Sequence, residues 1–149
     1  MKTLVIYDSL HGNTRTIAQA IGDAIPGEVE VQNVGEASSP ELAGYDLLIV
    51  GAPTHGGRAS DGLRALLDQI PARALEGVRV AGFDTRLTHK LARIFGFAAP
   101  KIARALEKMG GTLAGPPGDF YVTGSEGPLK AGELERAAAW ARGLAGSQT

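Results

Sequence analysis

The 149-residue chain contains no cysteine, and its aromatic residues number only four phenylalanines, three tyrosines and one tryptophan. The missing cysteine excludes disulfides, thiolate metal sites and cysteine nucleophiles, and fits a reducing cytoplasm, where we expect the protein. No apolar run approaches the roughly 20 residues of a membrane-spanning helix. The N-terminal apolar run meets Asp8 too soon for a signal peptide.

The chain also lacks an excess of charge of either sign. Its formal net charge is -1, with 21% charged and 44% hydrophobic residues. This balance gives no signal for a nucleic acid or a membrane surface as partner. It is ordinary for a soluble globular protein, and the length predicts one domain over residues 1–149.

Five apolar segments predict β-strands, and apolar residues at helical spacing lie between them. The last helical stripe comprises Leu134, Ala137, Ala138, Ala141 and Leu144. Alternation of strand and helix predicts a doubly wound α/β fold, a five-stranded parallel sheet with helices on both faces. The predicted strands are 3–7, 29–34, 46–51, 78–83 and 119–123, the last beginning as early as 112.

Ligands of such sheets bind beyond the carboxyl ends of the strands. The loops at 8–14, 52–60 and 84–99 are therefore the expected site. The first loop, SLHGNT, leads into a helix whose first amides have no intrahelical acceptor, and so suits an anion such as phosphate. The alternative is that Asn13 or Thr14 caps the helix. The polar side chains offered to an anion are those of Ser9, His11, Asn13 and Thr14.

Several phosphate-binding or phosphate-transferring classes are excluded by their motifs. The first loop matches neither GxxxxGK[ST] nor GxGxxG. The segment GAPTHGG (51–57) offers no phospho-accepting aspartate, and the absence of cysteine excludes a C-x5-R phosphatase. The three histidines fall in three different loops, so we expect no metal site.

Three segments in the expected site resemble the flavodoxin family. VIYDSLHGNTRTIAQAI (5–21) resembles its FMN-phosphate signature, GAPTHGG its second flavin loop, and FDTR (83–86) the start of its third. SEGPL (125–129), followed by GELERAAAWA, is similar to the C-terminal end of small flavodoxin-domain proteins. The resemblance covers nearly the whole chain and implies the strand order 2-1-3-4-5.

The resemblance implies FMN as cofactor and a role for each matching residue. The phosphate would be held by Ser9, Leu10 through its N–H, His11, Gly12, Asn13 and Thr14. One side of the isoalloxazine ring would be lined by Pro53, Thr54, His55, Gly56 and Gly57. The pyrimidine edge or the other face would meet Asp84, Thr85, Arg86 and Leu87.

The function implied is electron transfer, with one or two electrons passing between a reductase and an acceptor protein. The flavin supplies the chemistry, so no residue need be catalytic. We expect a monomer or weak dimer. Gly57 allows a peptide flip coupled to flavin reduction, or serves as a tight turn.

Two departures from the family pattern keep other functions open. No aromatic residue lies in 52–60 or 84–94, Phe95 and Phe97 fit either the core or the flavin, and Trp140 is expected at the edge of the last helix. The open ring face favours a small FMN-dependent oxidoreductase acting on a quinone or porphyrinogen-like substrate, with His55 and His89 as candidate proton donors. The lost aromatics also fit a non-redox module of the same fold.

The second departure is charge. Residues 85–106 contain no acid. Their cations form either a solvated basic face or a cluster that favours the anionic reduced flavin and raises its potential. In the second case Arg86→Glu would lower that potential. The cations are Arg86, Lys90, Arg93, Lys101 and Arg104, with Arg58 nearby in the second loop.

Overall fold

The computed structural model describes residues 1–37, 42, 44–54, 60–87, 96–124 and 126–146. The strands are β1 (Lys2–Tyr7), β2 (Glu28–Asn33), β3 (Leu47–Pro53), β4 (Arg79–Leu87), β5 (Thr112–Leu113) and β6 (Gly118–Val122). The helices are α1 (Asn13–Ala24), α2 (Asp61–Asp68), α4 (Ala98–Lys108) and α5 (Glu133–Gly146).

The sheet is parallel and has the order β2-β1-β3-β4-β5, with β6 also paired to β4. The predicted order 2-1-3-4-5 is confirmed, with the fifth strand divided in two. β5 pairs with the start of β4 and β6 with its end. Pro116 and Pro117 lie between the two pieces, and proline has no N–H to donate to a sheet.

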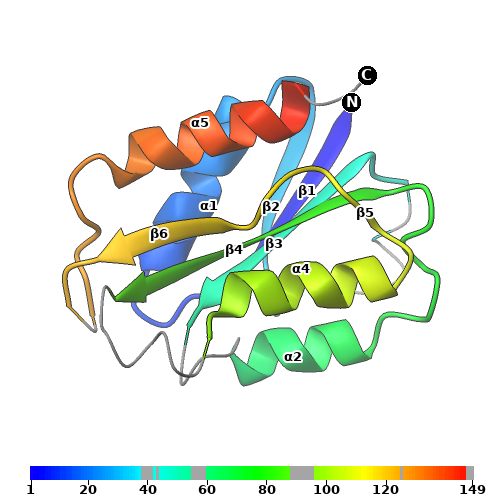
Figure 1. Ribbon diagram of the computed structural model, residues 1–149, viewed down its shortest axis with the longest axis horizontal. Coiled ribbons are helices and arrows are strands. Elements are labelled where there is room, and N and C mark those ends of the chain that lie inside the picture. The colour runs from blue at the N-terminus through cyan, green and yellow to red at the C-terminus, as the bar shows by residue number, and fades with distance from the viewer. Residues whose placement is uncertain (38–41, 43, 55–59, 88–95, 125, 147–149) are drawn as a thin grey trace.

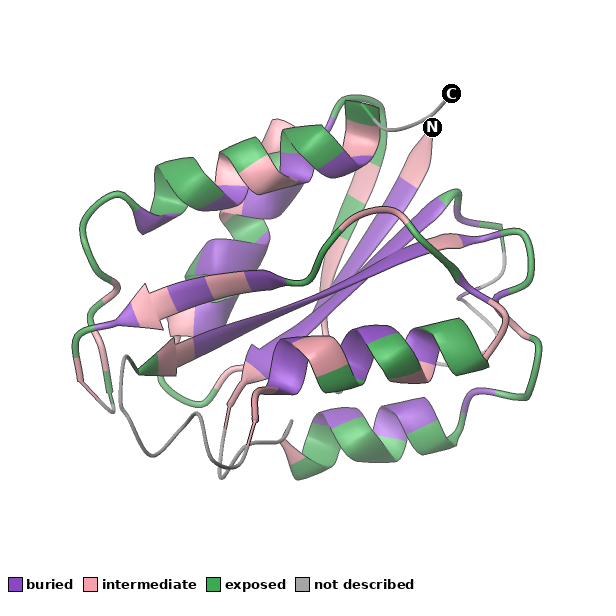
Figure 2. Cartoon of the chain, viewed as in Figure 1, coloured by how far each residue is buried: buried purple, intermediate pink, exposed green. Residues whose placement is uncertain are grey.

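Helices cover both faces of the sheet, as predicted. α1 and α5 lie on one face, and α2 and α4 on the other (Figure 1). Leu4 and Ile6 of β1 pack into the core under α2 and α4, whereas Val5 and Tyr7 pack into the core under α1. The central strands are therefore buried on both sides, which explains their nearly continuous apolar sequence (Figure 2).

The first turn of α5 differs from the predicted stripe. Leu134 is 44% exposed, while its neighbour Glu133 is only 5% exposed. The Glu133 carboxylate accepts hydrogen bonds from the Tyr121 amide (2.7 Å) and the Arg136 guanidinium (2.6 Å). These two partners offset the cost of burying a charge, which apolar spacing alone does not reveal.

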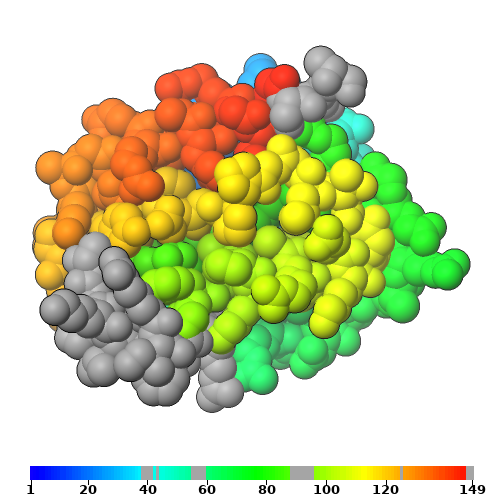
Figure 3. Space-filling view, viewed as in Figure 1, coloured from blue at the N-terminus to red at the C-terminus, as the bar shows by residue number. Residues whose placement is uncertain are grey.

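The rest of α5 packs as expected. The Trp140 ring makes edge contacts with Phe83 and Phe120, at centroid distances of 6.1 and 5.9 Å. Its indole N–H donates to the Pro116 carbonyl at 2.9 Å. Trp140 therefore closes the core beside β6, whose segment lies between α4 and α5 at the surface in Figure 3.

β4 continues four residues beyond its predicted end, to Leu87. Asp84, Thr85, Arg86 and Leu87 thus belong to a strand, and their predicted place in a loop is wrong. β6 pairs along this extension, from Phe83 to Leu87. Within the described residues, no helix has both the length and the apolar character needed to cross a bilayer.

Candidate functional site

The turn from β1 into α1 leaves the start of the helix open. Gly12 is the N-cap residue, with φ 90° and ψ -10°, a left-handed conformation that glycine adopts without strain. The Ser9 hydroxyl oxygen accepts a hydrogen bond from the Gly12 amide at 3.0 Å and retains its own proton for donation. A Cβ added at Gly12 would meet no atom of the described residues within 4 Å.

No side chain among the described residues caps α1, and its first turn carries no acid. The alternative that Asn13 or Thr14 serves as the cap is therefore wrong. The Asn13 carboxamide donates to the Glu126 carbonyl (3.2 Å), and the Thr14 hydroxyl bonds to that of Thr85 (2.8 Å). The first amides of α1 and the positive end of its dipole remain for an anion.

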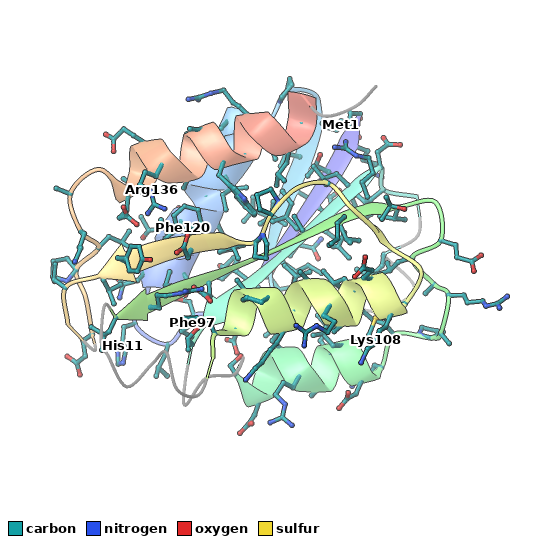
Figure 4. All side chains as sticks on the ribbon, viewed as in Figure 1. Met1, His11, Phe97, Lys108, Phe120 and Arg136 are labelled. Atoms are coloured by element: carbon teal, nitrogen blue, oxygen red, sulfur yellow. The ribbon has the colours of Figure 1, made fainter. Side chains whose placement is uncertain are left out.

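The predicted phosphate ligands differ in exposure. Leu10 is 65% exposed and His11 is also exposed at this end of the sheet (Figure 4). The Thr14 side chain is 1% exposed and faces Thr85. The structure therefore favours the backbone amide of Thr14 over its hydroxyl as an anion ligand.

Two of the other described helices that begin at this edge of the sheet, α2 and α4, have protein caps. In α2, the Ser60 hydroxyl accepts from the Leu63 amide (3.4 Å) and donates to the Asp8 carboxylate (2.5 Å). In α4, the Thr54 hydroxyl accepts from the Ala98 amide at 3.1 Å. Both termini are thus filled by the protein's own oxygens.

Asp84 supplies a second oxygen to the start of α4. It is fully buried, and one carboxylate oxygen accepts a hydrogen bond from the Ala99 amide at 2.9 Å. The Arg86 guanidinium donates to both oxygens, at 2.8 and 2.7 Å. The guanidinium carbon lies 3.5 Å from the centre of the Phe97 ring, just before α4. The buried Asp84 carboxylate, held by Arg86, therefore helps to fix where α4 begins.

Thr85 joins the same strand end to the other two loops. Its hydroxyl bonds to Thr14 of α1, and its carbonyl accepts a hydrogen bond from the Thr54 amide at 3.0 Å. The end of β4 thus connects the three segments that were predicted to surround a flavin. The contacts predicted between Asp84–Leu87 and the flavin itself stay a prediction.

Arg86 is not an isolated positive charge. Asp119 of β6 lies 3.9 Å from its guanidinium and 3.5 Å from that of Arg136. The hydrogen bond from Tyr121 to Asp119, together with burial, raises the pKa of the Tyr121 hydroxyl, and the hydrogen bond to Glu133 raises the pKa of Arg136. Arg136 reaches over Phe120 from α5 (Figure 4). Acids therefore compensate the Arg86 member of the predicted basic cluster.

Some predicted residues lie outside the described residues, namely His55, Gly56, Gly57, Arg58, His89, Lys90, Arg93 and Phe95. The proposed Gly57 flip and the histidine proton donors stay predictions. Pro53 and Thr54 are half-buried at the end of β3, and Lys101 and Arg104 are exposed on α4. Sequence reasoning missed the contact of Asn13 with the turn at Glu126, although the SEGPL segment contains that turn.

The fold and site define a doubly wound α/β protein with an open helix N-terminus at the carboxyl edge of its sheet. A flavodoxin domain family model matches residues 4–115. The chain is 32% identical over 124 residues to a flavodoxin of Maridesulfovibrio salexigens, covering 76% of this chain and 82% of that protein. The chain therefore belongs to the flavodoxin family.

Two further comparisons extend this result. The crystal structure of oxidised flavodoxin 2 from Bacillus cereus superposes with a TM-score of 0.81 at 25% identity, covering 98% of this chain and 99% of that one. An NAD(P)H dehydrogenase (quinone) of Cupriavidus metallidurans is 31% identical over 100 residues, covering 52% of this chain and 50% of that protein. The family and fold predicted from residues 5–21 and the strand pattern are confirmed.

Proposed function

We propose that this protein carries electrons between a reductase and an acceptor protein, with FMN held by its phosphate at the N-terminus of α1. FMN is the cofactor of flavodoxins, and electron transfer to partner proteins is their function. The uncapped first turn of α1 is the observation that supports this placement of the phosphate. The α2 and α4 termini, with their own caps, offer no equivalent.

The residues of the first loop fit a phosphate dianion. Backbone amides and neutral side chains would hold it, a nest without a compensating lysine. The Ser9 hydroxyl retains a proton to donate, and Gly12 leaves space at the helix start. The proposed phosphate ligands are Ser9, Leu10, His11, Gly12, Asn13 and Thr14.

The ring would lie against the ends of β3 and β4. The hydrogen bond between the Thr54 amide and the Thr85 carbonyl holds these two strand ends side by side. The flavin supplies one- and two-electron chemistry when bound. The protein's part is to bind and orient it and to limit access to it. We propose that the protein acts as a monomer or weak dimer and recognises a reductase and an acceptor as separate partners.

Titration of the apoprotein with FMN and with riboflavin tests the proposed cofactor. We expect the fluorescence of FMN to be quenched when it binds. We also expect FMN to bind at least about tenfold more tightly than riboflavin, because charge-assisted hydrogen bonds to the phosphate add affinity. Equal affinities for FMN and riboflavin would contradict the proposal that the N-terminus of α1 binds the phosphate. Failure of both flavins to bind would overturn the function itself and favour a non-redox module.

A second candidate is an FMN-dependent oxidoreductase that reduces a quinone. The similarity of about half the chain to an NAD(P)H dehydrogenase (quinone) favours it. Steady-state assays with NAD(P)H and a soluble quinone separate the two. An electron carrier should require an added reductase, whereas the enzyme should turn over alone.

A further inference from the structure

The turn that follows β6 contacts the first residue of α1, more than a hundred positions earlier in the chain. The Asn13 carboxamide nitrogen donates to the Glu126 carbonyl at 3.2 Å. The same carboxamide lies against Gly127: a Cβ placed there would be 2.6 Å from its oxygen and 2.8 Å from its nitrogen. Glycine at 127 is therefore required for this contact.

The turn is anchored to β6. The Thr123 amide donates to the Pro128 carbonyl at 2.8 Å, and the Lys130 amide donates to the Tyr121 carbonyl at 2.9 Å. The Gly127 amide closes the turn onto the Gly124 carbonyl at 3.0 Å. Because β6 pairs with β4 in the sheet, the position of the turn is set independently of α1. It can therefore act as a fixed surface against which Asn13 is held.

The held carboxamide still has hydrogen-bonding capacity. Its nitrogen carries two protons, of which the Glu126 carbonyl takes one. A free asparagine at a helix start can bond to nearby backbone groups, and so compete with an anion for the first amides. Holding Asn13 against Gly127 prevents this competition and leaves one N–H in a defined orientation.

We propose that the turn at Glu126 and Gly127 is a positioning element for the FMN phosphate, and that it sets the preference of this protein for FMN over riboflavin. This inference rests on the proposed function. Glu126 acts through its carbonyl and Gly127 through its lack of a side chain. Both act through Asn13.

The chain offers a matched control for Gly127. Gly132 also has a positive φ, +86° against +101° for Gly127, and lies in the same connection between β6 and α5. A Cβ at Gly132 would meet no atom within 4 Å in the part of the chain that the structure describes. Gly127→Ala and Gly132→Ala therefore both place a side chain at a positive φ, and only the first places its Cβ against Asn13.

The experiment measures dissociation constants of FMN and riboflavin for both alanine variants and the wild type. One charge-assisted hydrogen bond corresponds to roughly tenfold in affinity. We expect Gly127→Ala to weaken FMN about tenfold and to change riboflavin less than about twofold, with Gly132→Ala changing neither. Equal losses in the two variants, or equal losses of both flavins in Gly127→Ala, would overturn the proposal.

The variant Asn13→Ala completes a double-mutant cycle. In that background Gly127→Ala should cost no further FMN affinity, because the displaced carboxamide is already absent. Additive losses would contradict the inference. If Gly127→Ala does not fold, NMR measurement of the Asn13 carboxamide protons in the wild-type protein provides the test instead. The chemical shift of one of the two carboxamide protons should change when FMN binds and not when riboflavin binds. The absence of such a difference would contradict the proposal.

A wild-type protein that binds neither flavin would remove the proposed function. If the wild-type protein prefers FMN and Gly127→Ala prefers it equally, only the proposed role of the turn is contradicted.

Discussion

Helices α1 and α4 begin at the same edge of the sheet, but their N-termini differ in whether side chains accept hydrogen bonds from their first amides. At α4, the Thr54 hydroxyl and the Asp84 carboxylate accept the Ala98 and Ala99 amides. At α1, a left-handed glycine begins the helix and no described side chain caps it. The difference teaches that the start of α4 is closed by a resident carboxylate, whereas the start of α1 has no such partner among the described residues, which supports the proposal that it binds an anion.

The largest effect should come from removing the resident charge at α4. In Asp84→Asn, the Arg86 guanidinium, on a side chain that is 10% exposed, loses its closest compensating charge, with Asp119 remaining at 3.9 Å. Breaking a buried ion pair by removing one partner costs about 3 kcal/mol. Urea denaturation should show a loss of this order, against less than about 0.5 kcal/mol for the exposed control Asp68→Asn. A loss below about 1 kcal/mol would mean that Asp84 does not close α4 as described.

A smaller effect should come from breaking the link between the two termini. Thr85→Val removes the hydroxyl that bonds to Thr14, leaving a buried hydroxyl unpaired. That costs about 1–2 kcal/mol of stability. Thr85→Ser keeps the hydroxyl and should recover most of the loss. Thermal unfolding of both variants measures the difference, and a Thr85→Val variant as stable as the wild type would contradict a stabilising role of the hydroxyl pair.

The smallest effect should come from giving α1 the negative charge that it lacks. Arg15→Glu places an acid in the first turn of α1, just as Asp61 is an acid in the first turn of α2. A carboxylate there stabilises the apoprotein by about 0.5 kcal/mol through the helix dipole, but repels a phosphate. We therefore expect FMN to bind about fivefold more weakly while the apoprotein becomes slightly more stable.

The control for this charge is Arg15→Gln, which removes the cation without adding an acid. Calorimetric titration and urea denaturation of both variants separate the two contributions. At an anion site, Arg15→Glu should bind FMN more weakly than Arg15→Gln does, while its apoprotein is more stable. These opposite changes distinguish an anion site from an ordinary helix end. Changes of the same sign in both quantities would contradict the open terminus.

The two termini also differ in how far the sequence predicts them. The open terminus at α1 could be predicted because its determinants are contiguous, from Ser9 to Thr14. The strands themselves followed similarly from local apolar runs, and their order followed from the resemblance to flavodoxins. The closed terminus at α4 could not, because Asp84 meets the amide of Ala99, fifteen residues later. Sequence reasoning instead ended the strand before the charged pair and placed both residues in a loop.

Glu133 and Glu126 show the same limit at the other end of the chain. Glu133 is buried because the Tyr121 amide and Arg136 meet its carboxylate, and Glu126 contacts Asn13 through a backbone carbonyl that no side-chain pattern reports. Local spacing predicts elements and contiguous loops. Pairings between distant segments, which decide whether a polar group serves the protein or a ligand, require the structure.

The most direct test of the open terminus compares backbone amide resonances of the FMN and riboflavin complexes. The flavin ring is common to both, so their difference isolates the phosphate. We predict that this difference falls on the amides of Gly12 to Arg15, and that the amides of Ala98 and Ala99 show none. A phosphate-dependent change at Ala98 or Ala99, or none at the start of α1, would contradict the account.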